Sequence, residues 1–163
     1  MCTSPLSSMA LTAMINLKGL AMGIAAIASF AGALTNGIVF KKLKLGDKSS
    51  ILAVMLEPLT QADIISKNPI PVYLADYIGG GLGGLAAAYF GIINNASGTA
   101  SPIPGMLAPL GFNPPLTVLA ALVFAALGGI IGGIVGVKIY TFIIGFKTKH
   151  LGEQLSIIKG SEA

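Results

Sequence analysis

Two uncharged stretches of 22 residues each, 19–40 and 116–137, restrict the possible folds of this chain more than any other feature. A helix of that length is roughly 33 Å long, because each residue adds about 1.5 Å, and the hydrocarbon core of a bilayer is about 30 Å thick. Only 10% of the residues are charged, against about 25% in ordinary soluble domains. The sequence therefore predicts an all-α integral membrane protein that crosses the cell membrane several times, with the lipid bilayer as its surroundings.

The few charged and reactive side chains exclude several other classes of protein. The cationic side chains are all lysines and lie at the ends of apolar runs, so no nucleic-acid partner is expected. Cys2 is the only cysteine and His150 the only histidine, which leaves neither a disulfide framework nor a metal site. No cofactor is expected. Whether the chain is an enzyme stays open, because it has no Ser/His/Asp set and no GxxxxGK[ST] loop; any phosphotransfer would need partner proteins.

The apolar residues fall into four blocks, which predict about three transmembrane helices and one or two re-entrant hairpins. The blocks cover residues 9–40, 51–66, 70–93 and 116–144. A polar break rich in Asn, Ser, Gly and Pro, residues 94–115, separates the last two blocks. We expect residues 1–145 to form one membrane domain.

The lysines predict the orientation. The clusters at 41–48 and 147–149 should both be cytoplasmic, so an even number of crossings must separate them. Block 51–66 has 16 residues, and a helix of that length is about 24 Å long, too short to cross the bilayer. We therefore expect a re-entrant segment over residues 50–69, an outer position for the break at 94–115, an outside N-terminus and a cytoplasmic C-terminus.

Two further features concern the ends of the chain. The first 17 residues carry no basic segment, so we interpret the N-terminus as mature sequence rather than a signal peptide. In the tail, residues 146–163, Leu151, Leu155 and Ile158 have helical spacing. This predicts a cytoplasmic amphipathic helix on the membrane surface, with a docking site for a soluble partner as the alternative.

Glycines in the apolar blocks are spaced for close helix packing. Gly128, Gly132 and Gly136 recur every four residues, and Gly80 and Gly84 repeat the device in the preceding block. Such spacing puts small residues on one helix face, where another helix can approach closely. Packing within the chain and a homodimer face are both compatible with it.

The candidate site lies in the segment 51–71, where Glu57-Pro58, Gln61, Asp63 and Asn68-Pro69 interrupt aliphatic residues. Ionisable groups at membrane depth usually face a cavity or a partner. Glu57, Gln61 and Asn68 offer the acceptors and donors that solute hydroxyls need, and the i, i+4 spacing of Glu57 and Gln61 would place them on one helix face. Pro58 suits a first helical turn, which would put Glu57 near a half-helix N-terminus. The alternative is that Glu57 pairs with Lys67 or caps backbone N–H groups.

A second polar cluster comprises Asn94, Asn95, Ser97, Thr99 and Ser101. These residues either form turns or line a solute pocket opposite Glu57. Three other polar residues receive structural predictions. We expect Asp63 to form an interfacial ion pair with Lys67, Asp76 to lie at the membrane interface, and Asn36, next to Thr35, to bond across helices.

Three stretches resemble a known family. LEPLTQADIISKNPIPVYLADYIGGGLGG and INNASGTASPIPGMLAPLGF, with the opening TSPLSSMALTAMINLKGLAMGIAAIA, look like the C-terminal half of phosphotransferase-system enzyme IIC-like sugar permeases. The resemblance implies a sugar-like solute and soluble phosphocarrier subunits as partners. Members of that family are longer, so we also expect a second membrane half or a homodimer partner. Leu56-Glu57-Pro58 is similar to a Glu-Pro motif in the re-entrant hairpin of more distant sugar permeases, where the carboxylate binds sugar hydroxyls, with Leu in place of the usual Thr.

Three functions are compatible with these features. The first is a permease component that binds and translocates a sugar-like solute. The second is a non-transporting structural, regulatory or sensor subunit descended from a permease. The third is a small ion or solute channel with Glu57 in its path.

Overall fold

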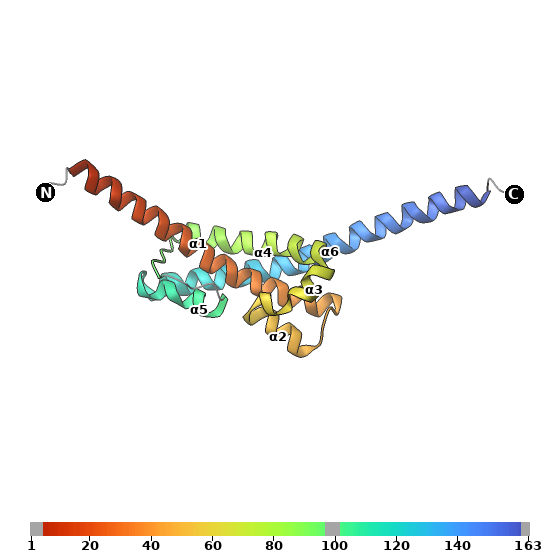
Figure 1. Cartoon of the computed structure of the whole chain (residues 1–163), viewed down its shortest axis with the longest axis horizontal. Coiled ribbons are helices and arrows are strands. Elements are labelled where there is room, and N and C mark those ends of the chain that lie inside the picture. The colour runs from red at the N-terminus through yellow and green to blue at the C-terminus, as the bar shows by residue number, and fades with distance from the viewer. Residues whose placement is uncertain (1–4, 97–101, 161–163) are drawn as a thin grey trace.

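The computed structural model describes residues 5–96 and 102–160, all of whose regular elements are helices (Figure 1). The prediction of an all-α fold is confirmed. The helical elements are α1 (Pro5–Leu43), α2 (Lys48–Leu56), η1 (Pro58–Gln61), α3 (Ala62–Lys67), α4 (Pro69–Tyr89), α5 (Pro102–Leu107), η2 (Ala108–Gly111) and α6 (Pro115–Gly160).

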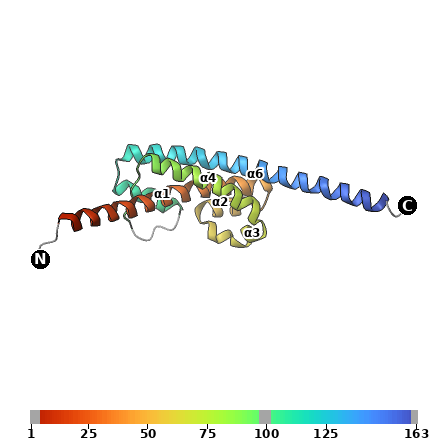
Figure 2. The same ribbon diagram turned by 90° about the horizontal axis from the view of Figure 1, so that it is seen from above.

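Helices α1, α4 and α6 form a three-helix bundle (Figures 1 and 2). Within the described residues, two segments are long and apolar enough to cross a membrane, Leu17–Leu43 and Pro115–Gly145. Only 39% of the apolar window of each is buried inside the protein, whereas a core helix of a soluble protein would be mostly covered. Helix α4 has 21 residues, or roughly 31 Å, and is not one of these two segments.

Contacts at small residues show the relative directions of the helices and how closely their backbones approach. A Cβ atom at Gly132 would meet the backbone of Gly79, and one at Gly136 would meet Ala75. The partner residue numbers fall as the α6 numbers rise, so α4 and α6 are antiparallel. A Cβ at Gly129 would meet Ala31, and one at Gly133 would lie 2.8 Å from Ile38 Cβ, so α1 and α6 run parallel.

The predicted glycine positions differ in how tightly they pack. Gly128 lies against Leu82 of α4. Gly132 and Gly136 also pack against α4, at the residues named above. A Cβ at Gly80 or Gly84 would meet α1 atoms only at 3.6 Å and 3.4 Å, which is ordinary contact. The close approach of α4 to α1 is made instead by the neighbouring Gly79 and Gly83.

Thr35 joins the three helices at their centre. Its hydroxyl lies 2.9 Å from the Gly129 carbonyl of α6 and 2.9 Å from the Ala31 carbonyl of its own helix. Gly79 of α4 packs against the same hydroxyl. The interhelical hydrogen bond predicted for Asn36 is thus made by the residue before it.

Two irregular units lie beside α1 on one side of the bundle (Figure 1). The first, α2–η1–α3, breaks at Glu57 and Asn68, whose backbones leave the helical region (φ −150°, ψ 95° and φ −132°, ψ 53°). Each precedes a proline, which disfavours the helical conformation of the residue before it. The second unit is α5–η2. With nine and six residues, α2 and α3 are each too short to cross a bilayer. Their entry into the bilayer as a re-entrant hairpin stays a prediction.

The lysine-rich positions gather toward one end of the bundle. Val137 of α6 packs with Val39 and Phe40 near the end of α1, and α6 continues past this level in the same direction. Residues 147–149 therefore lie on the side of the bundle where the 41–48 cluster lies. Helix α6 reaches Gly160 without a break, so the segment predicted as a separate tail helix is continuous with it. Its placement on a membrane surface stays a prediction.

Candidate functional site

The end of α2 positions Glu57 beside the middle of α1. Asp47 caps the start of α2, because its carboxylate accepts the Ser50 backbone N–H at 2.8 Å. Near the other end, Val54 is fully buried and Met55 lies against Gly37, where a Cβ would be 2.5 Å from Met55 Cγ. The helix then stops at Glu57.

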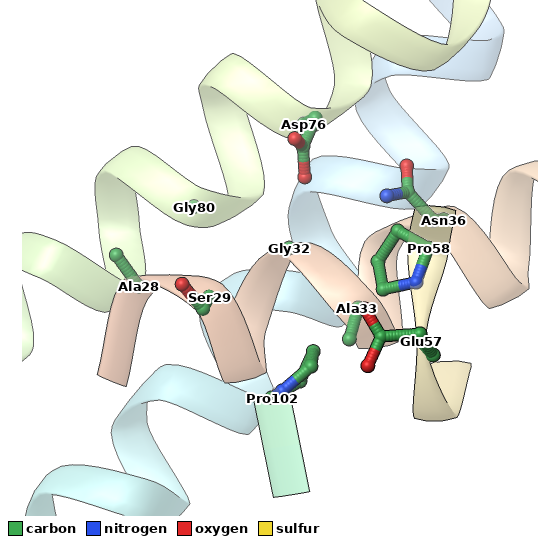
Figure 3. Close-up of a pocket in the computed structure, with 10 residues that line it drawn as sticks. All are labelled: Ala28, Ser29, Gly32, Ala33, Asn36, Glu57, Pro58, Asp76, Gly80 and Pro102. Carbon is green, nitrogen blue, oxygen red and sulfur yellow. The ribbon is translucent and has the colours of Figure 1, made fainter. Parts of the chain in front are cut away.

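A cavity of about 370 Å³ opens between α1, α4, the α2–η1 junction and α5 (Figure 3). Small-molecule sites have volumes of roughly 300–1,000 Å³. Its α1 wall consists mainly of small side chains, which leave the space empty. The lining residues are Ala28, Ser29, Gly32, Ala33, Asn36, Glu57, Pro58, Asp76, Gly80 and Pro102.

The cavity is lined by two carboxylate residues from different elements, Glu57 and Asp76, and by Asn36 of α1, with Pro58 between Asn36 and Glu57 (Figure 3). Asn36 is only 4% exposed. Within the described structure, the Oδ1 atoms of Asn36 and Asp76 are buried and have no hydrogen-bond partner. A buried acceptor without a partner costs about 1–3 kcal/mol, so such groups call for a functional explanation.

Gly32 makes room for the Asp76 carboxylate. A Cβ on Gly32 would meet Asp76 Oδ1, and Asp76 points toward α1 at this position (Figure 3). The antiparallel packing of α4 on α1 brings Asp76 to the cavity; its expected place at the membrane interface stays a prediction. The available sequence signal is the i, i+4 series Ala28, Gly32, Asn36, which marks a face of α1 with room for a neighbouring side chain.

Of the three predicted ligands in this segment, the structure brings Glu57 alone to the cavity. No helix runs from Glu57 to Gln61, because the chain is extended at Glu57 and then forms a 3₁₀ turn. The shared helix face assumed from their spacing is therefore absent. Gln61 is not part of the lining, and the Asn68 amide donates to the Ile64 carbonyl at 3.1 Å.

The expected ion pairs are also missing from the part of the chain that the structure describes. Neither Glu57 nor Asp63 pairs with Lys67, and both Asp63 and Lys67 are exposed. Glu57 contributes its backbone to the turn: its carbonyl accepts the Thr60 N–H at 3.1 Å and the Thr60 hydroxyl at 2.8 Å. Its carboxylate is left for the cavity.

The described members of the second predicted polar cluster, Asn94 and Asn95, lie away from this cavity. The Asn94 N–H donates to the Gly19 carbonyl at 2.9 Å, and Asn94 Oδ1 accepts the Ala96 N–H at 2.9 Å. Asn95 lies against Gly19. Gly19 precedes Gly32 by 13 residues, or about 20 Å along α1. Asn94 thus makes the side-chain-to-backbone bond of a turn, whereas the role of Asn95 stays a prediction; Ser97, Thr99 and Ser101 lie outside the described residues.

Asn113, which the sequence does not single out, ties this region together. Its Nδ2 donates to the carbonyls of Ile93 and Pro109 at 2.6 and 2.8 Å, and its Oδ1 accepts the Ile93 N–H at 3.0 Å. The only sequence signal is its place before Pro114-Pro115 at the start of α6. This amide fixes the loop after α4 to the loop before α6.

No group of three or more His, Cys, Asp or Glu side chains among the described residues could hold a metal ion. The chemistry available at the cavity is hydrogen bonding to a small polar molecule, with Glu57, Asp76 and Asn36 as acceptors.

Comparison with known proteins identifies the family. The sequence model of the family described as "Phosphotransferase system, EIIC" matches residues 1–154. No curated protein and no solved structure gives a match. The family match spans nearly the whole chain, and the two long apolar helices agree with a membrane location. This chain therefore belongs to the EIIC family of the phosphotransferase system, a family of membrane permease domains.

Proposed function

We propose that this chain binds and translocates a sugar-like solute and that the cavity beside Glu57 holds it. Membership of the EIIC family supports a sugar permease component. The observation that carries the proposal is the cavity itself, which is lined by the carboxylate residues Glu57 and Asp76 and by the amide residue Asn36. Together these groups can form hydrogen bonds to several hydroxyls of one molecule.

The composition of the wall fits a polyhydroxylated ring or chain. Glu57, Asp76 and Asn36 accept hydroxyl protons, and the Asn36 amide can also donate. The small residues Ala28, Gly32 and Ala33 offer an apolar surface for C–H groups. Hydrogen bonds in such a low-dielectric setting are stronger than in water, and an unfilled acceptor there is costly.

We further propose that the lysine-rich end of the bundle is cytoplasmic, which follows from the excess of lysine in cytoplasmic loops. Ser49 and Asn95 are exposed near opposite ends of the bundle. In a Cys2→Ser background, Ser49→Cys should react with an impermeant thiol reagent only from the cytoplasmic side and Asn95→Cys only from outside. The reverse labelling pattern would contradict the proposed topology.

Partners complete the proposed transport system. Because the chain offers no catalytic set, phosphorylation of the solute would depend on soluble phosphocarrier subunits. A second membrane half or a second copy of the chain would close the remaining walls of the cavity. Membership of the EIIC family supports the proposal of such partners.

The test is Glu57→Gln, which keeps the size of the side chain and removes its charge. A hydrogen bond to a charged group contributes about 1.5–3 kcal/mol, so hexose binding should weaken roughly 10- to 150-fold. Folded yield should not change, because the Glu57 carboxylate has no ion-pair partner in the described structure.

Asp63→Asn is the matched control, because Asp63 is an exposed carboxylate outside the cavity lining. It should leave both binding and yield unchanged. Equal losses of yield and binding in Glu57→Gln would make Glu57 a structural residue. Full activity of the assembled system after Glu57→Gln would favour a non-transporting subunit, and single-channel currents from the purified protein would favour a channel.

A further inference from the structure

A second cavity, of about 320 Å³, lies on the other side of Pro58 from the first. Its walls come from α1, η1, α3 and the first turns of α4. The lining residues are Asn36, Pro58, Ala62, Ile65, Ser66, Val72, Tyr73 and Asp76.

The two cavities share three residues, Asn36, Pro58 and Asp76. The first cavity then continues toward Glu57, Ser29 and α5. The second continues toward Ser66 and Tyr73. Asn36 and Asp76 thus lie where the two spaces adjoin, and Pro58 separates them.

This junction is also where the partnerless oxygens lie. Asn36 is 96% buried, and its Oδ1 and the Oδ1 of Asp76 have no hydrogen-bond partner in the described structure. Elsewhere in the described bundle, the buried polar side chains Thr35 and Asn94 have partners for their oxygens. The lining residues of both cavities include no lysine that could neutralise the Asp76 carboxylate.

We infer that Asn36 and Asp76 form a second binding position for the hydroxyl groups of a polyhydroxylated solute, which the solute occupies as it passes Pro58 between the two cavities. This inference rests on the proposed function. Hydroxyls bound first at the Glu57 side transfer to the Asn36–Asp76 pair and then reach the side of Ser66 and Tyr73.

The construction of the junction fits such a passage. Pro58 starts a single 3₁₀ turn of four residues, and its ring presents a small apolar edge without an N–H. The space for the acidic side chain depends on Gly32, whose missing Cβ leaves room for Asp76. This turn is not part of α1, α4 or α6, the helices that form the bundle.

The test uses cysteines on either side of Pro58 in a Cys2→Ser background. Ser29 lines only the first cavity and Ser66 only the second, and both are exposed. Glucose, mannose, galactose and mannitol are the probes, and the one that the full chain takes up is used. The chosen probe should slow the labelling of Ser29→Cys and of Ser66→Cys by an impermeant methanethiosulfonate. It should not slow the labelling of Ser49→Cys.

Adding Asp76→Asn should raise the concentration of that probe needed for half-protection about tenfold at both positions, as expected for loss of a charge-assisted hydrogen bond. Adding Asp63→Asn should not. If Asp76→Asn folds poorly, Asn36→Ser tests the same position and should weaken protection in the same way.

The outcomes separate the two ideas. Protection at Ser29→Cys without protection at Ser66→Cys, with uptake intact, would overturn the passage and leave the proposed function standing. Unchanged half-protection in both Asp76→Asn and Asn36→Ser would overturn the second binding position. Absence of uptake and of protection at both positions for every probe would overturn the proposed function itself.

Discussion

The hairpin region, residues 47–69, and the loop region, residues 91–115, use their polar groups in opposite ways. Both connect apolar helices and contain Pro, Asn and Ser, but only the hairpin region carries charged residues. In the loop region the amides of Asn94 and Asn113 bond to backbone groups. In the hairpin region the Glu57 carboxylate faces a cavity that Asn36 and Asp76 also line, each with an oxygen that has no hydrogen-bond partner in the described structure.

The difference lies in what the local backbone requires. Buried backbone N–H and C=O groups must find partners, and the irregular chain after α4 leaves those of Ile93 without a helix to satisfy them. Asn113 supplies both partners. The hairpin region is capped by Asp47 at α2 and by Asn68 at the end of α3. The backbone of the hairpin region therefore does not use the Glu57 carboxylate as a hydrogen-bond partner, and the carboxylate stays available for a ligand.

Replacing Asn113 should have the largest effect on stability. Asn113→Leu would leave the N–H and carbonyl of Ile93 without partners, at a cost of roughly 2–4 kcal/mol in the free energy of unfolding. Thermal unfolding of the detergent-purified protein should show a clearly lowered midpoint. Asn95→Leu, an exposed amide in the same loop, is the control and should change the midpoint little. Equal midpoints for the two variants would contradict the role of Asn113.

Two glycines of α1 allow the same substitution to be compared beside the loop region, at Gly23, and beside the cavity, at Gly32. A Cβ at Gly23 would meet the backbone carbonyl of Ile92, which cannot move aside, whereas one at Gly32 would meet the end of the Asp76 side chain. Overpacking against fixed atoms costs about 1–3 kcal/mol, so Gly23→Ala should lower the unfolding midpoint. Gly32→Ala should keep most of the stability and weaken hexose binding.

Measuring midpoint and hexose affinity for both glycine variants decides the comparison. The expected pattern is a stability loss for Gly23→Ala and an affinity loss for Gly32→Ala. If Gly32→Ala unfolded as easily as Gly23→Ala, the space beside Asp76 would be a packing feature rather than part of a solute site.

A smaller effect is expected from Asn36→Leu. The substitution removes a buried acceptor that has no partner, so the free energy of unfolding should stay within about 1 kcal/mol of the original value or rise. Hexose affinity should fall about fivefold, as for loss of a neutral hydrogen bond. Asn94→Leu, which loses the bond to Ala96, should instead lower the unfolding midpoint. A marked destabilisation by Asn36→Leu would show that its amide has a structural partner.

The sequence predicts the helical membrane architecture and the position of Glu57, because apolar runs and a Glu-Pro break are local features. It does not predict that Asp76 joins Glu57, since that depends on the antiparallel register of α4 on α1, which Gly79, Gly83 and Gly32 determine only in three dimensions. The prediction that Glu57 and Gln61 share a helix face is wrong for a local reason. Pro58 ends the helix at Glu57, so the i, i+4 spacing does not place the two side chains on one face.

The smallest expected effect concerns Asp47, whose cap begins the helix that ends at Glu57. Hydrogen bonds from the Ser50 backbone N–H, and then from the hydroxyls of Ser50 and Ser49, lower the pKa of Asp47 from 3.8 to about 2. A pKa that is lower in the folded state gives stability that is present above pH 3.8 and is lost as the pH falls through about 2. The effect is small because Asp47 is fully exposed and solvent screens its charge.

Asp47→Asn keeps a capping oxygen but cannot titrate, so it isolates this contribution. Between pH 4 and pH 2 the unfolding midpoint of the original chain should fall slightly more than that of the variant, and between pH 5 and pH 8 the two should run parallel. Identical acid profiles would mean that the cap does not couple to folding. In that case the position of Glu57 would depend on the buried contacts of Val54 and Met55 with α1, and the hairpin would be held by packing where the loop region is held by hydrogen bonds.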